Sequence, residues 1–141
     1  MNSTVQILPG VRRIGWVNCS SLPRQVAMSA ISGLPVALLT EINDITFFGQ
    51  PESRNITEKE NNGWVQSASL KFRSCDELPL DRHIAFVVTD VNGSNWLIGA
   101  YERPFPAVRY ERVTGSPSGD PAGLSYEITH KALRTMIPVL V

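Results

Sequence analysis

The residue types that could perform covalent catalysis are concentrated in the segment CDELPLDRH, residues 75–83. A nucleophilic site needs a thiol or hydroxyl, a base and a group that orients the base. Within this segment Cys75, Asp76, Asp81 and His83 supply those types. No nucleophile-elbow pattern surrounds the cysteine, however, and turn-rich loops carry acidic residues for solubility in any case. We therefore expect an ordinary loop with no catalytic residues, and we expect the protein not to be an enzyme.

Metal binding by imidazole would depend on the two histidines, His83 and His130. Glu127 lies three residues before His130, and on a strand residues three apart point to opposite faces. These two side chains would share a metal only if the segment were helical. Carboxylates would suit calcium, but the chain lacks the regularly spaced Asp residues of a calcium loop. We expect neither a metal nor a cofactor.

Charge and composition argue against phosphate, nucleic acid and membrane ligands. The segment TGSPSGDPAG, residues 114–123, has prolines where a phosphate-binding loop needs N–H donors, and no Lys follows it. The 13 Lys and Arg residues balance 13 Asp and Glu residues, which removes a general attraction to nucleic acid or an anionic membrane. No run approaches the roughly 18 apolar residues of a membrane helix. We expect neither nucleic acid nor a membrane as a partner.

The aromatic segment NWLIGAYERPFPAVRY, residues 95–110, is the strongest candidate for a binding surface. Proline removes donors from a strand, so RPFP marks a sheet edge or a corner where the chain crosses between sheets. Aromatic residues at such an edge commonly contact another protein or form the rim of a ligand site. The candidate interface or ligand rim comprises Trp96, Tyr101, Arg103, Pro104, Phe105 and Tyr110. Trp16 and Trp64 are expected in the core, where most tryptophans lie.

The elements that would position these residues are short strands. In WVQSASLKF, residues 64–72, apolar residues alternate with polar ones, which is the period of a half-buried strand. An Asn-Gly turn at Asn92 and Gly93, flanked by β-branched and aromatic residues, predicts a hairpin. Further strands are predicted at residues 11–18, 45–49, 107–113 and 124–131.

Short strands punctuated by Gly, Pro and Asn predict an all-β fold, an antiparallel β-sandwich or barrel with at most one short helix. The length of 141 residues is that of one ordinary domain, so we expect a single β domain over residues 1–141. Residues 1–10 form a candidate N-terminal arm, and the polar residues 50–63 predict a mobile loop. Residues 24–31 and 129–136 are compatible with helix or strand.

The low charge content indicates association with a partner. Charged residues make up 18% of the chain, below the usual quarter, so less of the surface can be covered by charge. The closing residues MIPVLV are apolar, and such tails dock on their own core or add a strand to a neighbour. Cys19 and Cys75 lack the C-x-x-C spacing of a zinc or redox site and are expected as cytosolic thiols. We expect a homo-oligomer in the cytoplasm.

The segment from residue 96 to residue 138 resembles small proteins encoded among the virion genes of Bacteroidetes phages and prophages. The common pattern is an aromatic strand ending in Ile-Gly, a proline corner, a second aromatic strand, a Gly/Asp loop, a strand with Tyr and Ile, and a proline near the chain end. It is carried here by Trp96, Ile98, Gly99, Pro104, Phe105, Tyr110, Asp120, Gly123, Tyr126, Ile128 and Pro138. The resemblance implies a tail or head-tail component that packs into rings with its own copies and contacts other virion proteins.

Residues and resemblance together predict a non-enzymatic phage-type structural or assembly protein that acts by self-association, cytoplasmic during assembly and then part of the virion. The alternative is a small β-sandwich module that binds a ligand of the carbohydrate type through the corner from Trp96 to Phe105. An enzyme that uses Cys75 and His83 is a third class, which a lowered thiol pKa would favour.

Overall fold

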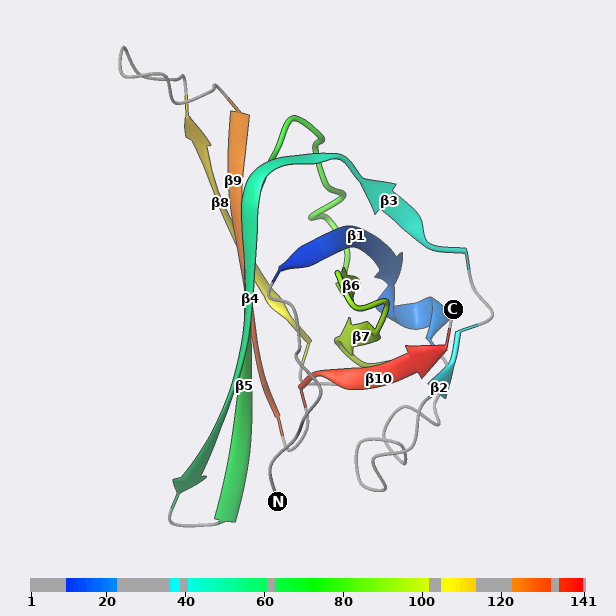
Figure 1. The fold of residues 1–141 in the computed structure, drawn as a ribbon, viewed down its shortest axis with the longest axis vertical. Coiled ribbons are helices and arrows are strands. Elements are labelled where there is room, and N and C mark those ends of the chain that lie inside the picture. The colour runs from blue at the N-terminus through cyan, green and yellow to red at the C-terminus, as the bar shows by residue number, and fades with distance from the viewer. Residues whose placement is uncertain are drawn as a thin grey trace.

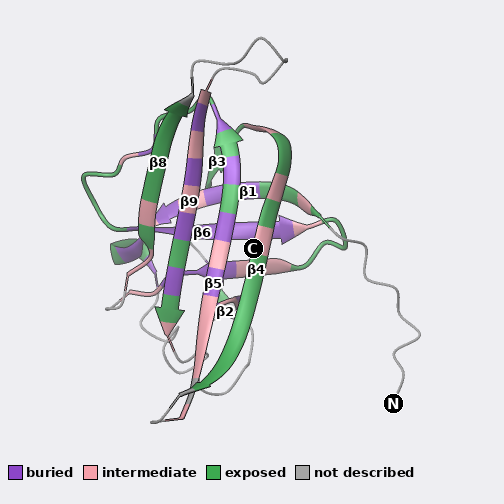
Figure 2. Cartoon of the chain, turned by 90° about the vertical axis from the view of Figure 1, so that its left-hand side faces the viewer, coloured by how far each residue is buried: buried purple, intermediate pink, exposed green. Residues whose placement is uncertain are grey.

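The computed structural model describes residues 10–22, 36–38, 41–60, 63–101, 105–113, 123–132 and 135–140. In this part of the chain two β-sheets pack face to face as a sandwich that is not closed into a barrel (Figure 1). The long strands of one sheet cross those of the other at a steep angle (Figure 2). The predicted all-β class is confirmed, and the sandwich is the correct one of the two predicted architectures.

The first sheet has six strands in the order β2-β10-β7-β6-β1-β3. Their bounds are Val11–Asn18 for β1, Val36–Ala37 for β2, Asn43–Ile45 for β3, Ile84–Asp90 for β6, Asn95–Ile98 for β7 and Ile137–Leu140 for β10. Neighbouring strands are antiparallel, except that the two-residue β2 pairs parallel with β10.

The second sheet has four antiparallel strands in the order β4-β5-β9-β8. Their bounds are Phe47–Glu60 for β4, Gly63–Ser74 for β5, Ala107–Val113 for β8 and Gly123–Ala132 for β9. The only helical turn in the described residues is the 3-10 turn η1, Cys19–Ser21. β9 shows that residues 129–132 are strand, whereas residues 24–31 and 133–134 lie outside the described part.

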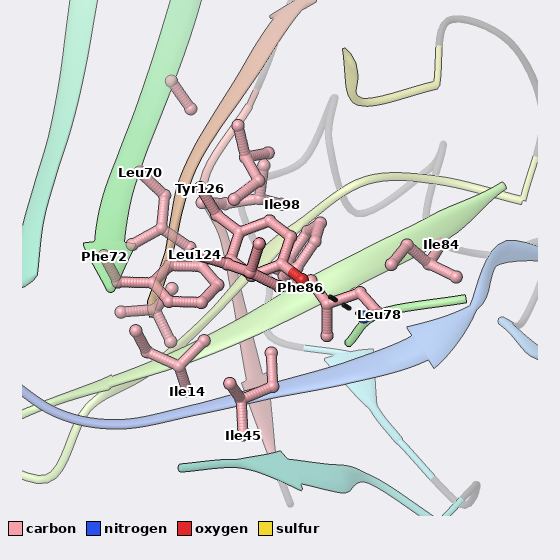
Figure 3. Packing of buried hydrophobic residues seen from close by; sticks show 13 residues of the cluster. Ile14, Ile45, Leu70, Phe72, Leu78, Ile84, Phe86, Ile98, Leu124 and Tyr126 are labelled. Carbon is pink, nitrogen blue, oxygen red and sulfur yellow. Dashed lines mark hydrogen bonds between the residues drawn. The ribbon is translucent and has the colours of Figure 1, made fainter. Parts of the chain in front are cut away.

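The main core lies between the two sheets. Alternate residues of β5 and β9 point towards β1 and β6 and are buried, as Figure 3 shows for Leu70, Phe72, Leu124 and Tyr126. The polar residues between them face away from the core, as the period of two in residues 64–72 predicts. The side chain of Trp64 is not among those described, and Trp16 packs against this core.

A second core lies on the outer face of the six-stranded sheet. Ala85 and Val87 of β6 belong to it, while Phe86 and Val88 belong to the core between the sheets. β6 is therefore buried on both faces, which explains why its sequence is continuously apolar rather than alternating. Leu22, Leu38, Ile42, Ala100, Tyr101 and Phe105, which lie between strands, pack on this second core.

The predicted hairpin is confirmed by β6 and β7. Its turn contains Gly93 at φ 89°, a left-handed conformation that glycine adopts without strain. Asp90 N–H donates to the Ser94 carbonyl at 3.0 Å, and the Asp90 carboxylate accepts N–H bonds from Asn92 and Ser94. The turn therefore closes through both backbone and side-chain hydrogen bonds.

The prediction of a loop at residues 50–63 is wrong, because residues 50–60 belong to β4. β4 pairs with β5 continuously from Glu52 to Glu60. It lies at a sheet edge and is exposed from Arg54 to Lys59, so it needs no apolar alternation and its polar sequence resembles a loop. Residues 1–9 of the predicted arm lie outside the described part.

Candidate functional site

The structure distributes the predicted interface or ligand rim over three places. Trp96 lies on β7, Tyr101 and Phe105 lie between β7 and β8, and Tyr110 lies on β8. Arg103 and Pro104 fall outside the described residues. β7 and β8 belong to different sheets, which confirms the predicted sheet-crossing corner. The same crossing separates the aromatic side chains that the sequence placed on one rim.

Trp96 lines a cleft of about 460 Å³ that opens beside β4. Val88 and Met136 form its apolar floor, and Glu52 and Ser53 belong to its β4 side. The indole Nε1–H of Trp96 donates to Asp90 Oδ2 at 3.4 Å. Because Asp90 also accepts the turn N–H bonds, the Asp90 carboxylate at this cleft is engaged in holding the hairpin.

Tyr101 and Phe105 line a second hollow of about 500 Å³. The ring of Phe105 stacks on the ring of His83, with centroids 4.0 Å apart and planes inclined by 14°. Asn18 and Cys19 approach from the end of β1, because Cys19 N–H donates to the His83 carbonyl at 3.1 Å. An aromatic wall thus lies beside polar side chains, the combination that small-ligand sites use.

The polar groups of this hollow differ in what they can do. The Cys19 side chain is 2% exposed, and burial raises its thiol pKa to about 11. A thiol with that pKa is neutral at physiological pH and is a poor nucleophile. Cys19 is therefore not suited to act as a nucleophile in this hollow. The Oδ1 atom of Asn18 is buried and accepts no hydrogen bond from the described residues.

The four residues of the candidate nucleophilic segment have separate neighbours in the structure. Asp76 Oδ2 accepts the N–H of Thr46 at 2.8 Å, and the Asp81 carboxylate lies 3.5 Å from Arg82. Cys75 is exposed, and His83 stacks on Phe105. Within the described chain these four side chains make no hydrogen bond to one another, so they do not form a nucleophile–base pair.

The histidine and carboxylate of β9 lie on opposite faces of their strand. His130 is buried in the sandwich, whereas Glu127 is on the outer face, opposite Arg109 of β8 and Lys71 of β5. In the described residues no group of three or more His, Cys, Asp or Glu side chains is placed to hold a metal ion. Nor does that part of the chain contain a helix long and apolar enough to cross a membrane.

Tyr110 marks the third place, at the free edge of the four-stranded sheet. Its side chain is 54% exposed, and its ring centroid lies 6.0 Å from that of the buried Tyr126. Leu80, which is 37% exposed, lines a small hollow with it. Among the described strands β8 pairs with β9 on one side only, and no described residue pairs with the backbone groups of its other side.

The sequence indicated Tyr101 and Phe105 of this hollow as candidate rim residues, but it carried no signal that Asn18 and His83 would join them. Asn18 and His83 are distant in the chain, and only the pairing of Asn18 with Ile84 in β1 and β6 brings them together. By contrast, an aromatic residue at an alternating position of a charged strand was a local signal for Tyr110.

Searches of protein-family models, of curated proteins and of solved structures each find no match to this chain.

Proposed function

We propose that this chain is a non-enzymatic structural protein that acts by self-association, as a tail or head-tail component of a phage-type virion does. The observation that carries the proposal is the open edge of the four-stranded sheet at β8, with an exposed aromatic residue at its centre. Monomeric proteins protect such edges, because unpaired N–H and C=O groups bind other strands. An edge left open is therefore suited to assembly.

The β4–β5 hairpin offers a second contact surface. β9 pairs with β5 only as far as Gln66, so beyond that point β4 and β5 form a two-stranded ribbon. This ribbon projects beyond the other strands at the lower end of the molecule in Figure 1. A two-stranded ribbon gains little stability from its own contacts, and docking on a neighbouring molecule would bury it.

The virion role is supported by the resemblance of residues 96–138 to phage virion proteins. The balance of 13 basic and 13 acidic residues also suits a protein that must approach its own copies without net repulsion. In such a role the protein would be cytoplasmic during assembly and would then remain in the virion, with its own copies and other virion proteins as partners.

Light scattering coupled to size exclusion, over a hundredfold concentration range, tests self-association. We expect the mass to rise from that of the 15.6 kDa monomer to a discrete oligomer or to growing polymers. A monomer at every concentration would overturn the proposal of self-association.

A second candidate function is ligand binding, favoured by the hollow where Phe105 stacks on His83. Planar aromatic surfaces beside polar lining residues such as Asn18 and Ser20 suit a carbohydrate or another ring-shaped polar ligand. Calorimetric titration with a panel of mono- and oligosaccharides tests it. Binding that is lost in Asn18→Ala but retained in Tyr110→Ser would support this function, and absence of heat with the whole panel would contradict it.

A further inference from the structure

The four-stranded and six-stranded sheets end in four edge strands, and these differ in how well they are protected. β2 has two residues and β3 has three, so both are too short to pair extensively with another chain. β4 is long, but its pairing with β5 is interrupted between Phe48 and Glu52, and Pro51 lies in that interruption. Short strands, bulges and prolines are the usual means of blocking an edge.

β8 has none of these protections. It is seven residues long, and all seven residues, from Ala107 to Val113, pair with β9 without a register shift. No proline interrupts it. Its protection against another strand consists of its charges alone, and charges repel or attract according to what lies opposite them.

The side chains of β8 divide between the two faces of the sheet. Arg109 lies opposite Glu127 and Glu111 opposite Ser125, so both belong to the outer, solvated face. Tyr110 lies opposite the buried Tyr126 and belongs to the inner face, where it is exposed only because it lies at the edge. A second strand added to this edge must therefore match the side chains on both the outer and the inner face of the sheet.

Two copies of β8 can pair antiparallel about a two-fold axis only in registers that keep the inner faces together. The central registers of this kind are centred on Arg109, Tyr110 or Glu111. The first places Arg109 against itself and the third places Glu111 against itself, and like charges directly opposite are destabilising. The register centred on Tyr110 instead places Arg109 opposite the partner's Glu111 twice.

That register is also the one with the greatest overlap. With Tyr110 at the axis, Ala107 lies opposite the partner's Val113, so every residue of β8 is paired. The two tyrosines meet on the inner face, next to the hollows that Leu80 lines. Arg112 lies opposite the partner's Val108. Its guanidinium stays near Glu77 of its own chain, where the distance from Arg112 Nη2 to Glu77 Oε1 is 3.6 Å.

We infer that β8 is a self-complementary edge through which two copies of this chain pair antiparallel, centred on Tyr110, joining two four-stranded sheets into one continuous sheet. This inference rests on the proposed function, because it names the surface of the self-association. An isologous contact of this kind closes as a dimer. Assembly beyond the dimer would then use another surface, such as the β4–β5 hairpin.

Charge reversal tests the register. Arg109→Glu places two acidic residues on the outer face of β8, at positions 109 and 111, and Glu111→Arg places two basic residues there. Each reversal therefore turns the two attractive 109–111 pairs of the dimer into two repulsive ones. We expect each single variant to weaken the dimer at least about tenfold by analytical ultracentrifugation. The double variant Arg109→Glu/Glu111→Arg restores both pairs and should dimerise like the parent chain.

Mixing the two single variants provides the sharpest readout. An acidic chain and a basic chain are complementary across this edge, so native mass spectrometry of the mixture should show the mixed dimer in excess over either homodimer. Arg73→Glu is the matched control, because it makes the same charge change on an exposed residue of β5, which lies between β4 and β9 and is not an edge strand. Circular dichroism checks that every variant folds, since Arg109→Glu also faces Glu127 within its own chain.

Cysteine cross-linking independently tests which residue of β8 lies at the two-fold axis of the dimer. In a Cys75→Ser background, Tyr110→Cys should form an intermolecular disulfide on mild oxidation, since residues directly opposite have Cβ atoms about 4.5–5.5 Å apart. Arg112→Cys should not, because its two copies would lie about 14 Å apart along the strands, four residues at about 3.4 Å each. Equal cross-linking of both variants would overturn the register.

The outcomes separate this inference from the proposed function. Self-association that is lost in the single variants and recovered in the double variant and the mixture supports both. Self-association that none of the reversals changes overturns the β8 inference and leaves the proposed function standing. A parent chain that is monomeric at all concentrations, with no Tyr110→Cys disulfide, overturns both.

Discussion

Tyr126 links the core to the loop that contains the candidate nucleophilic residues. Its hydroxyl donates to the Asp76 carbonyl at 2.8 Å and accepts the Leu78 N–H at 3.3 Å, the bond drawn dashed in Figure 3. The ring is 2% exposed and lies 5.2 Å from that of Phe72. The segment 75–83 is thus held by a buried hydroxyl, and its Asp76 carboxylate accepts the backbone N–H of Thr46.

Tyr126→Phe should lower the free energy of unfolding by about 1–3 kcal/mol, because it removes one hydroxyl and leaves the Leu78 N–H without its partner. Urea denaturation followed by tryptophan fluorescence measures the change. Phe72→Leu is a useful comparison, since it alters packing on the same ring and leaves the hydrogen bonds in place. A Tyr126→Phe variant as stable as the parent would show that the loop is held by other contacts.

The two thiols should differ sharply in reactivity. Cys75 is exposed, whereas burial raises the pKa of Cys19 to about 11. At pH 8 iodoacetamide should modify Cys75 in the native protein and Cys19 only after unfolding, as peptide mass spectrometry would show. Because the folded-state pKa is raised, the stabilisation of the neutral thiol is present below about pH 9 and is lost as the pH rises towards 11. Rapid native alkylation of Cys19 would contradict its burial.

At the scale of elements, Gly99 determines how β7 leaves its sheet. Its φ of 140° is a conformation that side chains rarely adopt. A Cβ atom there would lie 2.5 Å from the Ala85 Cβ and 3.3 Å from Pro106. The chain therefore needs glycine at this position to pass close to β6 and cross to the other sheet.

Gly99→Ala should destabilise the fold by about 2 kcal/mol or more, since it combines backbone strain with overpacking. Gly93→Ala is the matched control, because Gly93 also has positive φ but no atom within 4 Å of the added Cβ. We expect about 1 kcal/mol for Gly93→Ala by thermal or urea denaturation. Equal losses for the two variants would mean that close packing at Gly99 is unimportant.

A cross-sheet connection at the start of β10 joins the two layers. Thr135 is fully buried, and its Oγ1 donates to Asn55 Oδ1 at 2.6 Å while its N–H donates to Gln66 Oε1 at 3.1 Å. Asn55 and Gln66 belong to β4 and β5. These bonds anchor the segment before β10 to the four-stranded sheet through Asn55 of β4 and Gln66 of β5.

At the scale of the whole molecule, β6 unites the two cores. Phe86 packs in the core between the sheets and Val87 packs in the second core, so this one strand contributes side chains to both cores. The polar outer face of the four-stranded sheet, with Lys71 between Glu52 and Glu127, needs no further cover. In the described part of the four-stranded sheet, the surface open to a partner is therefore the β8 edge rather than the outer face.

Hydrogen exchange should follow this organisation. Amides of β6 should exchange most slowly, because the strand is buried on both faces and paired on both sides. Amides of β4 near Glu58 should exchange fastest among the described strands, since only the ribbon with β5 protects them. Exchange measured by mass spectrometry at low protein concentration checks this order, and protection at Glu58 equal to that of β6 would contradict it. On self-association, protection should also rise in β8.

The strands of the core could be predicted from the sequence because their signals are local. Ala68, Leu70 and Phe72 alternate with polar residues, and Gly93 closes a short turn, so a few neighbouring residues specify each element. The extent of β4 could not be predicted in this way. An edge strand exposed over half its length has no apolar period, and only its pairing with β5 reveals it.

The sequence by itself determined the all-β class, the apolar rows of β5 and β9 and the hairpin at Gly93, and it left the proline corner open between a sheet edge and a crossing between sheets. Only the tertiary structure decided which side chains meet and which edges stay open. It separated Trp96, Phe105 and Tyr110, and it brought His83 to Cys19. The reason is physical: alternation is a property of adjacent residues, whereas strand order depends on pairings between residues far apart in the chain.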